Sequence, residues 1–305
     1  MVSRPWLSLI LAPLSMVGLL AQPMGAQELE PRAYSVAPVG TEFLVISFGR
    51  SVGDVSFDPT LPFEEVGATV NVALFGYYRS MNVFGRSGSV TVGVPVPTGS
   101  IQGLVAGEFA RAERTGLADP RFRFAVNLVG APAMSPGDYA GYEQTTTLGV
   151  SLAVVAPLGQ YDPTRLINLG SNRWSFKPEI GLSKRIGRWF VDVYAGAWLF
   201  TTNDDFVGRR KSQAPLANAQ MHLVYSLRPG FWMAFDANFY TGGRTTIDGI
   251  ASFDVQRNSR VGGTLAMPLS ARQSLKFLAS TGAFGSAGSD FDSFAVVYQY
   301  LLGPR

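Results

Sequence analysis

The chain has 305 residues, no cysteine and only 15% charged residues, below the roughly 25% of ordinary soluble domains. The formal net charge of +3 is small, and the one run of basic residues, Arg209 to Lys211, is short. These features exclude a disulfide-stabilised secreted domain and argue against a nucleic-acid-binding protein. Beyond residue 26, no stretch holds the roughly 20 apolar residues that a membrane-spanning helix needs.

The first 26 residues are typical of a cleavable secretory signal peptide. Arg4 supplies the positive charge, Trp6 to Leu20 is an apolar run interrupted by Pro13, and cleavage is expected after Ala26. Residues 27–40, QELEPRAYSVAPVG, contain prolines and no periodic pattern. We interpret them as a periplasmic lead-in, with a segment tucked into the mouth of the following domain as the alternative.

From residue 41 onward, apolar and polar residues alternate along the chain. The clearest example is LADPRFRFAVNLV at 117–129, where the charged residues share one parity and the phenylalanines the other. Only an extended strand places alternate side chains on opposite faces. The alternation predicts about twelve strands, an even number as in bacterial barrels, near 41–52, 66–80, 86–97, 117–129, 144–157, 172–185, 189–201, 215–227, 231–241, 257–269, 273–283 and 290–302.

The predicted connections alternate between short and long. The short ones lie near 81–85, 186–188, 228–230 and 270–272. The long ones lie near 53–65, 98–116, 158–171, 202–214 and 242–256. Short periplasmic turns and long extracellular loops are characteristic of outer-membrane barrels. The long connection at 130–143 falls on the predicted periplasmic side and does not fit this rule.

The fold predicted for residues 41–302 is therefore all-β, a transmembrane antiparallel β-barrel of about 12 strands with apolar residues towards lipid and polar residues inside. A secreted soluble β-sandwich is the alternative. A barrel of this size lies between those filled by side chains and those with open channels, so the lumen is expected to be narrow.

The polar parity predicts which residues line that lumen. They carry both signs of charge, whereas a strongly ion-selective pore has a ring of one sign. Either an ion-pair network braces the wall, or a polar constriction orients a substrate. The candidates are Asp119, Arg121, Arg123, Asn127, Lys177, Glu179, Asp192, His222, Asp236, Arg260 and Lys276.

Pro178 lies inside the predicted strand 172–185, where it cannot donate a ladder hydrogen bond. One interpretation is a bulge or a shorter strand. The other is a lateral window in the wall, which predicts unpaired backbone groups on the strands beside Pro178.

Catalysis and metal binding are not predicted. His222 is the only histidine, and no G-x-S-x-G nucleophile elbow occurs. Asp204 and Asp205 lack the spacing of a calcium-binding loop. We therefore expect neither an enzyme nor a cofactor.

Several segments resemble a bacterial outer-membrane family labelled transporter or putative MetA-pathway of phenol degradation protein. They are ELEPRAYSVAPVGTEF (28–43), GLADPRFRFAVNLVGAPA (116–133), APLGQYDPTRLINLGSNRWSFKPEIGLS (156–183), YTGGRTTIDG (240–249) and QRNSRVGGTLAMPL (256–269). The resemblance spans nearly the whole mature chain, and NRWSFKPE and ADPRFRFAVNL are its most specific parts. The chain ends in LLGPR and lacks the terminal aromatic of many outer-membrane barrels; Tyr300 is the nearest candidate.

The resemblance implies a barrel related to channels for hydrophobic compounds, such as the FadL-type channels. We therefore expect an outer-membrane channel, with both termini periplasmic, for passive uptake of small hydrophobic or aromatic compounds. Its expected partners are outer-membrane lipid, an unidentified small substrate and the barrel-assembly machinery. The alternative function is a non-transporting structural or interaction barrel with a plugged interior.

Overall fold

The computed structural model describes residues 29–56, 63–105, 108–165, 167–284 and 288–302. The predicted signal peptide and residues 27–28 lie outside the described residues. Among the described residues, no helix is both long and apolar enough to span a membrane.

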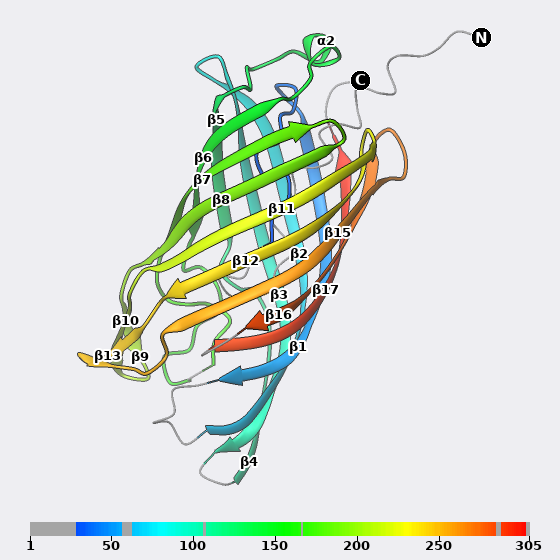
Figure 1. Cartoon of the computed structure of the whole chain (residues 1–305). Coiled ribbons are helices and arrows are strands. Elements are labelled where there is room, and N and C mark those ends of the chain that lie inside the picture. The colour runs from blue at the N-terminus through cyan, green and yellow to red at the C-terminus, as the bar shows by residue number, and fades with distance from the viewer. Residues whose placement is uncertain (1–28, 57–62, 106–107, 166, 285–287, 303–305) are drawn as a thin grey trace.

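Twelve strands of the described chain close into one antiparallel barrel, which confirms the predicted fold (Figure 1). Each strand pairs with its neighbours along the chain, and β1 pairs with β17 from Phe43↔Leu301 to Ser56↔Gly288 to close the ring. The strands are β1 (Glu42–Ser56), β2 (Phe63–Val83), β3 (Arg86–Val105), β5 (Arg121–Val129), β6 (Thr146–Val155), β7 (Ser175–Ile186), β8 (Trp189–Phe200), β11 (Leu216–Arg228), β12 (Phe231–Gly242), β15 (Gln256–Pro268), β16 (Gln273–Phe284) and β17 (Gly288–Leu301).

The barrel is apolar outside and polar inside, the reverse of a soluble protein. On β7, Ile180 and Leu182 are 49% and 43% exposed, whereas their neighbours Lys177 and Glu179 are buried. The same pattern recurs on β1 and β12, where Phe48 and Phe235 point outward. Phenylalanines and aliphatic residues exposed all round a closed sheet fit a surface that contacts lipid.

Several predicted loops contain strands. The prediction of a loop at 98–116 is wrong, because β3 continues to Val105 and pairs with β4 (Glu108–Thr115). β1 and β2 likewise extend into the predicted loop 53–65. These extensions were missed because they have few alternating apolar residues.

A small second sheet lies at the same end of the barrel, within the predicted loops 202–214 and 242–256. It consists of β9 (Asn203–Phe206), β10 (Arg209–Gln213), β13 (Thr245–Ile247) and β14 (Ile250–Ala251). We call it the rim sheet (Figure 1). We call this end of the barrel the loop end.

The opposite end, here called the turn end, carries the short turns. In the β2–β3 turn, Phe84 and Gly85 have φ values of +49° and +81°, and the Asn82 side chain accepts a hydrogen bond from Gly85 N at 2.7 Å. Positive φ at two central residues is the geometry that two-residue hairpins prefer. The start of β1 and the end of β17 also lie here, and so does the connection with helix α2 (Pro136–Tyr139).

Pro178 interrupts the wall only locally. On the β6 side it pairs with Leu152 in an unbroken ladder. On the β8 side the pairing stops after Phe176 and resumes at Glu179 in the same register. A Cβ placed on Gly196 of β8 would lie 2.7 Å from the Pro178 carbonyl oxygen, so the two strands remain in close contact. The ladder is therefore interrupted on the β8 side only, at Lys177 and Pro178, and the lateral window stays a prediction.

The occupied lumen as the candidate functional site

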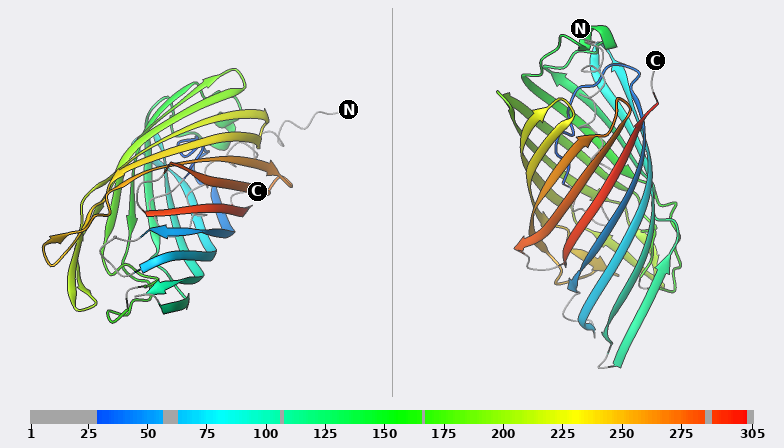
Figure 2. Two further views of the ribbon diagram at one scale, coloured as in Figure 1. Left: turned by 60° about the horizontal axis from the view of Figure 1, so that its bottom comes forward. Right: turned by 90° about the vertical axis from the view of Figure 1, so that its right-hand side faces the viewer.

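The lumen contains the chain's own N-terminal segment. Residues 29–38 are all buried, and their hydrogen-bond partners include side chains on the inner face of the barrel. Figure 2 shows this segment, in blue, within the ring of strands. The sequence left two placements open for residues 27–40, a periplasmic lead-in and a segment tucked into the barrel mouth. The contacts of residues 29–40 match the segment in the barrel mouth. We call residues 29–40 the plug.

Wall side chains satisfy the backbone of the plug. Glu30 N donates to Gln220 Oε1 at 3.2 Å, Arg32 N to Asp192 Oδ2 at 2.9 Å, and Ala33 N to Tyr194 OH at 3.1 Å. These acceptors come from the adjacent strands β8 and β11. Because buried backbone donors need partners, the polar wall allows a non-strand segment to be stable inside the barrel.

The Arg32 side chain anchors the plug near the turn end. Its guanidinium donates to Gln144 Oε1 at 3.0 Å and to Ser183 Oγ at 3.4 Å. Its Cζ atom lies 3.6 Å from the centre of the Phe190 ring. A guanidinium over an aromatic face gains cation–π stabilisation in addition to its hydrogen bonds.

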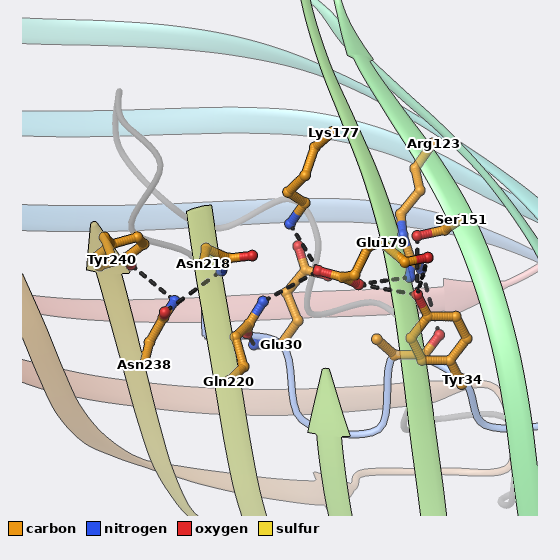
Figure 3. Close-up of polar contacts among 11 residues, drawn as sticks. Glu30, Tyr34, Arg123, Ser151, Lys177, Glu179, Asn218, Gln220, Asn238 and Tyr240 are labelled. Carbon is orange, nitrogen blue, oxygen red and sulfur yellow. Dashed lines mark hydrogen bonds and ion pairs between the residues drawn. The ribbon is translucent and has the colours of Figure 1, made fainter. Parts of the chain in front are cut away.

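Tyr34 lies at the centre of a second group of contacts (Figure 3). Its hydroxyl lies 3.0 Å from Glu179 Oε1 and 3.1 Å from Ser151 Oγ. Glu179 is held by two cations, with Arg123 Nη2 at 3.5 Å from Oε1 and Lys177 Nζ at 3.2 Å from Oε2. The plug and the charged wall therefore form one network.

A third group lies around His222, which is fully buried. Its Nδ1 is 2.7 Å from Asp236 Oδ1, and Thr264 Oγ1 donates to Asp236 Oδ2 at 2.7 Å. The Thr264 hydroxyl thus bonds to the carboxylate and not to the imidazole, which is not the arrangement of a nucleophile activated by histidine. Further along the wall, Arg260 Nη2 donates to Ser280 Oγ at 3.0 Å and to Phe291 O at 2.6 Å.

The connection between β5 and β6 closes over the plug at the turn end. Val39 N donates to Met134 O at 2.8 Å, and Tyr139 OH donates to Val36 O at 3.1 Å. Val36 and Met134 also share a buried apolar cluster with Ala131. Burial raises the pKa of Tyr139 to about 12, so its hydroxyl remains a donor at physiological pH. We call residues 130–145 the latch; covering the plug accounts for their length.

The sequence from residue 49 to 298 matches the family model described as putative MetA-pathway of phenol degradation. The chain belongs to this family. No curated protein matches it.

Solved structures with a similar fold are outer-membrane barrels. The COG4313 outer membrane channel from Pseudomonas putida F1 is 22% identical, with a TM-score of 0.75 over 90% of this chain and 100% of that one. The transport unit of the autotransporter AIDA-I from Escherichia coli is 12% identical, with a TM-score of 0.51 over 98% of this chain and 99% of that one. At these identities the similarity shows the fold, that of an outer-membrane β-barrel.

The predicted lumen residues of this family member lie mostly on the inner wall. All of them except Arg121, which is half-buried, are buried. The structure brings Arg123, Lys177 and Glu179 together, and it pairs His222 with Asp236. Asn127, Asp192, Arg260 and Lys276 are also buried.

Asp119 has a different position from the one predicted. The predicted strand 117–129 begins only at Arg121, because residues 116–120 separate β4 from β5. The Asp119 carboxylate accepts hydrogen bonds from Gly159 N at 2.8 Å and from Ser171 N at 2.7 Å. It therefore fastens the loop between β6 and β7 at the loop end.

Other residues of the site were missed. Glu30, Arg32 and Tyr34 lie in a segment without periodicity, so no local pattern marked them as buried. On the wall, Ser151, Tyr194 and Gln220 have the inward parity of their strands, and that parity could have identified them.

Proposed function

We propose that this protein is an outer-membrane channel for the passive passage of small aromatic or other hydrophobic compounds. Family membership and the fold of an outer-membrane channel support this function. The outward-facing apolar side chains support a location in the membrane, with both termini in the periplasm, as in other barrels with an even number of strands.

The proposal depends on how the plug is held inside the lumen. The ladder of the barrel begins at Glu42, and in the plug a backbone hydrogen bond to a strand is found at the last residue, where Gly40 N donates to Ser80 O of β2 at 3.1 Å. The plug is also held by side-chain hydrogen bonds and by the latch. Residues 29–38 can therefore leave the lumen, with Gly40 as the attachment point, without breaking a strand pair of the barrel, and the channel opens when they do.

Once the plug has left, the inner wall of the lumen fits solutes that combine an aromatic ring with a polar group. Tyr194, Trp198 and Tyr240 are buried on the inner face, next to the amides of Asn218 and Gln220. Aromatic faces stack on aromatic solutes, and the amides offer both donors and acceptors.

A non-transporting structural barrel is the second candidate. The ion pairs between Arg123, Lys177 and Glu179, together with the His222–Asp236 pair, support it because they form a braced, filled interior. In this alternative the plug is a permanent part of the core.

Liposomes containing the purified protein test the two candidates. We expect phenol and toluene to enter these vesicles faster than empty ones, while sugars of similar mass enter more slowly. Disulfide attachment of the plug to the latch, through V36C and M134C in this cysteine-free chain, should abolish the difference until a reductant is added. Flux equal to that of empty liposomes, with and without reductant, would support the structural barrel instead.

A further inference from the structure

The inner wall contains a hollow that fits a flat ring. Gly149 of β6 and Gly181 of β7 lie directly opposite each other in the ladder. The Tyr34 ring lies against both of them: a Cβ on either glycine would be less than 3.0 Å from ring carbons of Tyr34. Any other residue type at these two positions would exclude the ring.

Two wall side chains complete the hollow around the ring. The Tyr194 ring packs edge-on, with centroids 5.1 Å apart and an interplanar angle of 68°. The Arg123 guanidinium carbon lies 4.9 Å from the centre of the Tyr34 ring. Edge-to-face packing and cation–π contact are both specific for an aromatic ring.

The far end of the hollow recognises a hydroxyl group. Glu179 Oε1 accepts a hydrogen bond from the Tyr34 hydroxyl at 3.0 Å, and Ser151 Oγ lies 3.1 Å from the Tyr34 hydroxyl oxygen. Both residues are buried. A ring without a hydroxyl would leave this carboxylate oxygen and the serine without that partner, which is costly for buried polar groups.

We propose that this hollow, lined by Arg123, Gly149, Ser151, Glu179, Gly181 and Tyr194, is a binding site for phenols, and that Tyr34 is its resident internal ligand. A phenol bound in the same orientation projects its para substituent towards the lumen, where the Tyr34 backbone now lies. Para-substituted phenols therefore fit best. We call the hollow the phenol site.

Competition for the phenol site couples ligand binding to plug release. A phenol can occupy the site only when Tyr34 has left it, so the ligand binds only the state in which the plug is loosened. A ligand that binds one of two states shifts the equilibrium towards that state. This coupling rests on the proposed channel function, whereas binding to an emptied site does not.

The Y34A variant empties the site and allows a direct binding measurement. We expect p-cresol, which is the tyrosine side chain as a free molecule, to bind the purified detergent-solubilised variant and raise its melting temperature. Toluene has the same shape without the hydroxyl and should bind about tenfold more weakly or worse, because the partners of the hydroxyl stay unpaired. Calorimetric titration gives both affinities.

Matched variants locate the binding. In Y34A/G181A the added methyl group fills the floor of the site, and p-cresol binding should be lost. Y34A/S151A should bind p-cresol several-fold more weakly. Heat-modifiable migration on a gel verifies that each variant is a folded barrel. Equal affinity for toluene and p-cresol, unchanged binding in Y34A/G181A, or no p-cresol binding by folded Y34A would each overturn the proposal.

Flux measurements separate this proposal from the proposed function. If Y34A binds p-cresol selectively but no variant passes solutes, the phenol site stands and the channel function fails. If solutes pass but folded Y34A does not bind p-cresol, the channel stands and the phenol site fails.

Discussion

The plug and the rim sheet show how the same types of residue act in two environments. Both contain charged residues, and both arise from stretches whose structure the sequence pattern did not reveal. In the plug, Glu30 and Tyr34 are each 1% exposed and bonded to the wall. In the rim sheet, the side chains of the Arg210–Asp204 ion pair are 71% and 76% exposed. Buried polar contacts are costly to lose, whereas exposed ion pairs contribute little.

The comparison of the plug with the rim sheet predicts that removal of the plug has the largest effect on the channel. A variant in which the predicted signal peptide is joined directly to residue 41 loses the segment that fills the lumen. We expect single-channel conductance in planar bilayers to rise at least about tenfold, because an open lumen replaces a packed one. A conductance equal to that of the intact chain would mean that the wall side chains alone close the barrel.

Loss of the Arg32 side chain is expected to have the next largest effect. R32A removes two hydrogen bonds and the contact with Phe190. One charge-assisted hydrogen bond contributes about 2 kcal/mol, so loss of the shorter bond, to Gln144, should by itself raise the ratio of open to closed channel about 30-fold. Open probability measured in bilayers tests this expectation.

R32K is the matched control for that variant. It keeps the charge but lacks the planar fork of the guanidinium, so its open probability should lie between those of the wild type and R32A. An open probability for R32A equal to that of the wild type would show that the plug backbone contacts are sufficient to keep the lumen closed.

Much of the wall, and little of the plug, could be predicted from the sequence. Period-two parity placed Lys177, Glu179 and Asp236 on the inner face, because orientation in a strand is a local property. No local rule connects Tyr34 with Gly149 and Gly181, which are more than a hundred positions away. The fit of a ring against two glycines is a long-range contact that exists only once the barrel has closed. Asp119 was misplaced because a five-residue break between β4 and β5 interrupts an otherwise regular alternation.

A smaller effect is expected at the latch. Y139F removes the hydrogen bond to Val36 O but keeps the ring in the apolar cluster. A neutral hydrogen bond contributes about 1 kcal/mol, so open probability should rise about fivefold. An unchanged open probability would show that the apolar contacts alone hold the latch.

The pH dependence of the open probability of the wild type is a second test of the Tyr139 hydrogen bond. Burial raises the pKa of Tyr139 to about 12, above its ordinary value. The hydroxyl therefore stabilises the closed state below pH 10, and this stabilisation is lost as the pH rises through about 12. The wild type should approach the open probability of Y139F over this range. Y139F has no such hydroxyl and serves as the reference for all other alkaline effects. A constant ratio between the two proteins would rule out a contribution from Tyr139.

The smallest effect is expected in the rim sheet. R210A breaks the exposed ion pair with Asp204, whose N–O distance is 3.1 Å. Exposed pairs are worth at most about 1 kcal/mol and are weakened by salt. Stability, conductance and p-cresol binding should therefore match those of the wild type within error. If R210A instead changed open probability as strongly as R32A, control of the channel would lie at the loop end. In that case, burial of the plug in the lumen would not explain why its contacts matter more than those of the rim sheet.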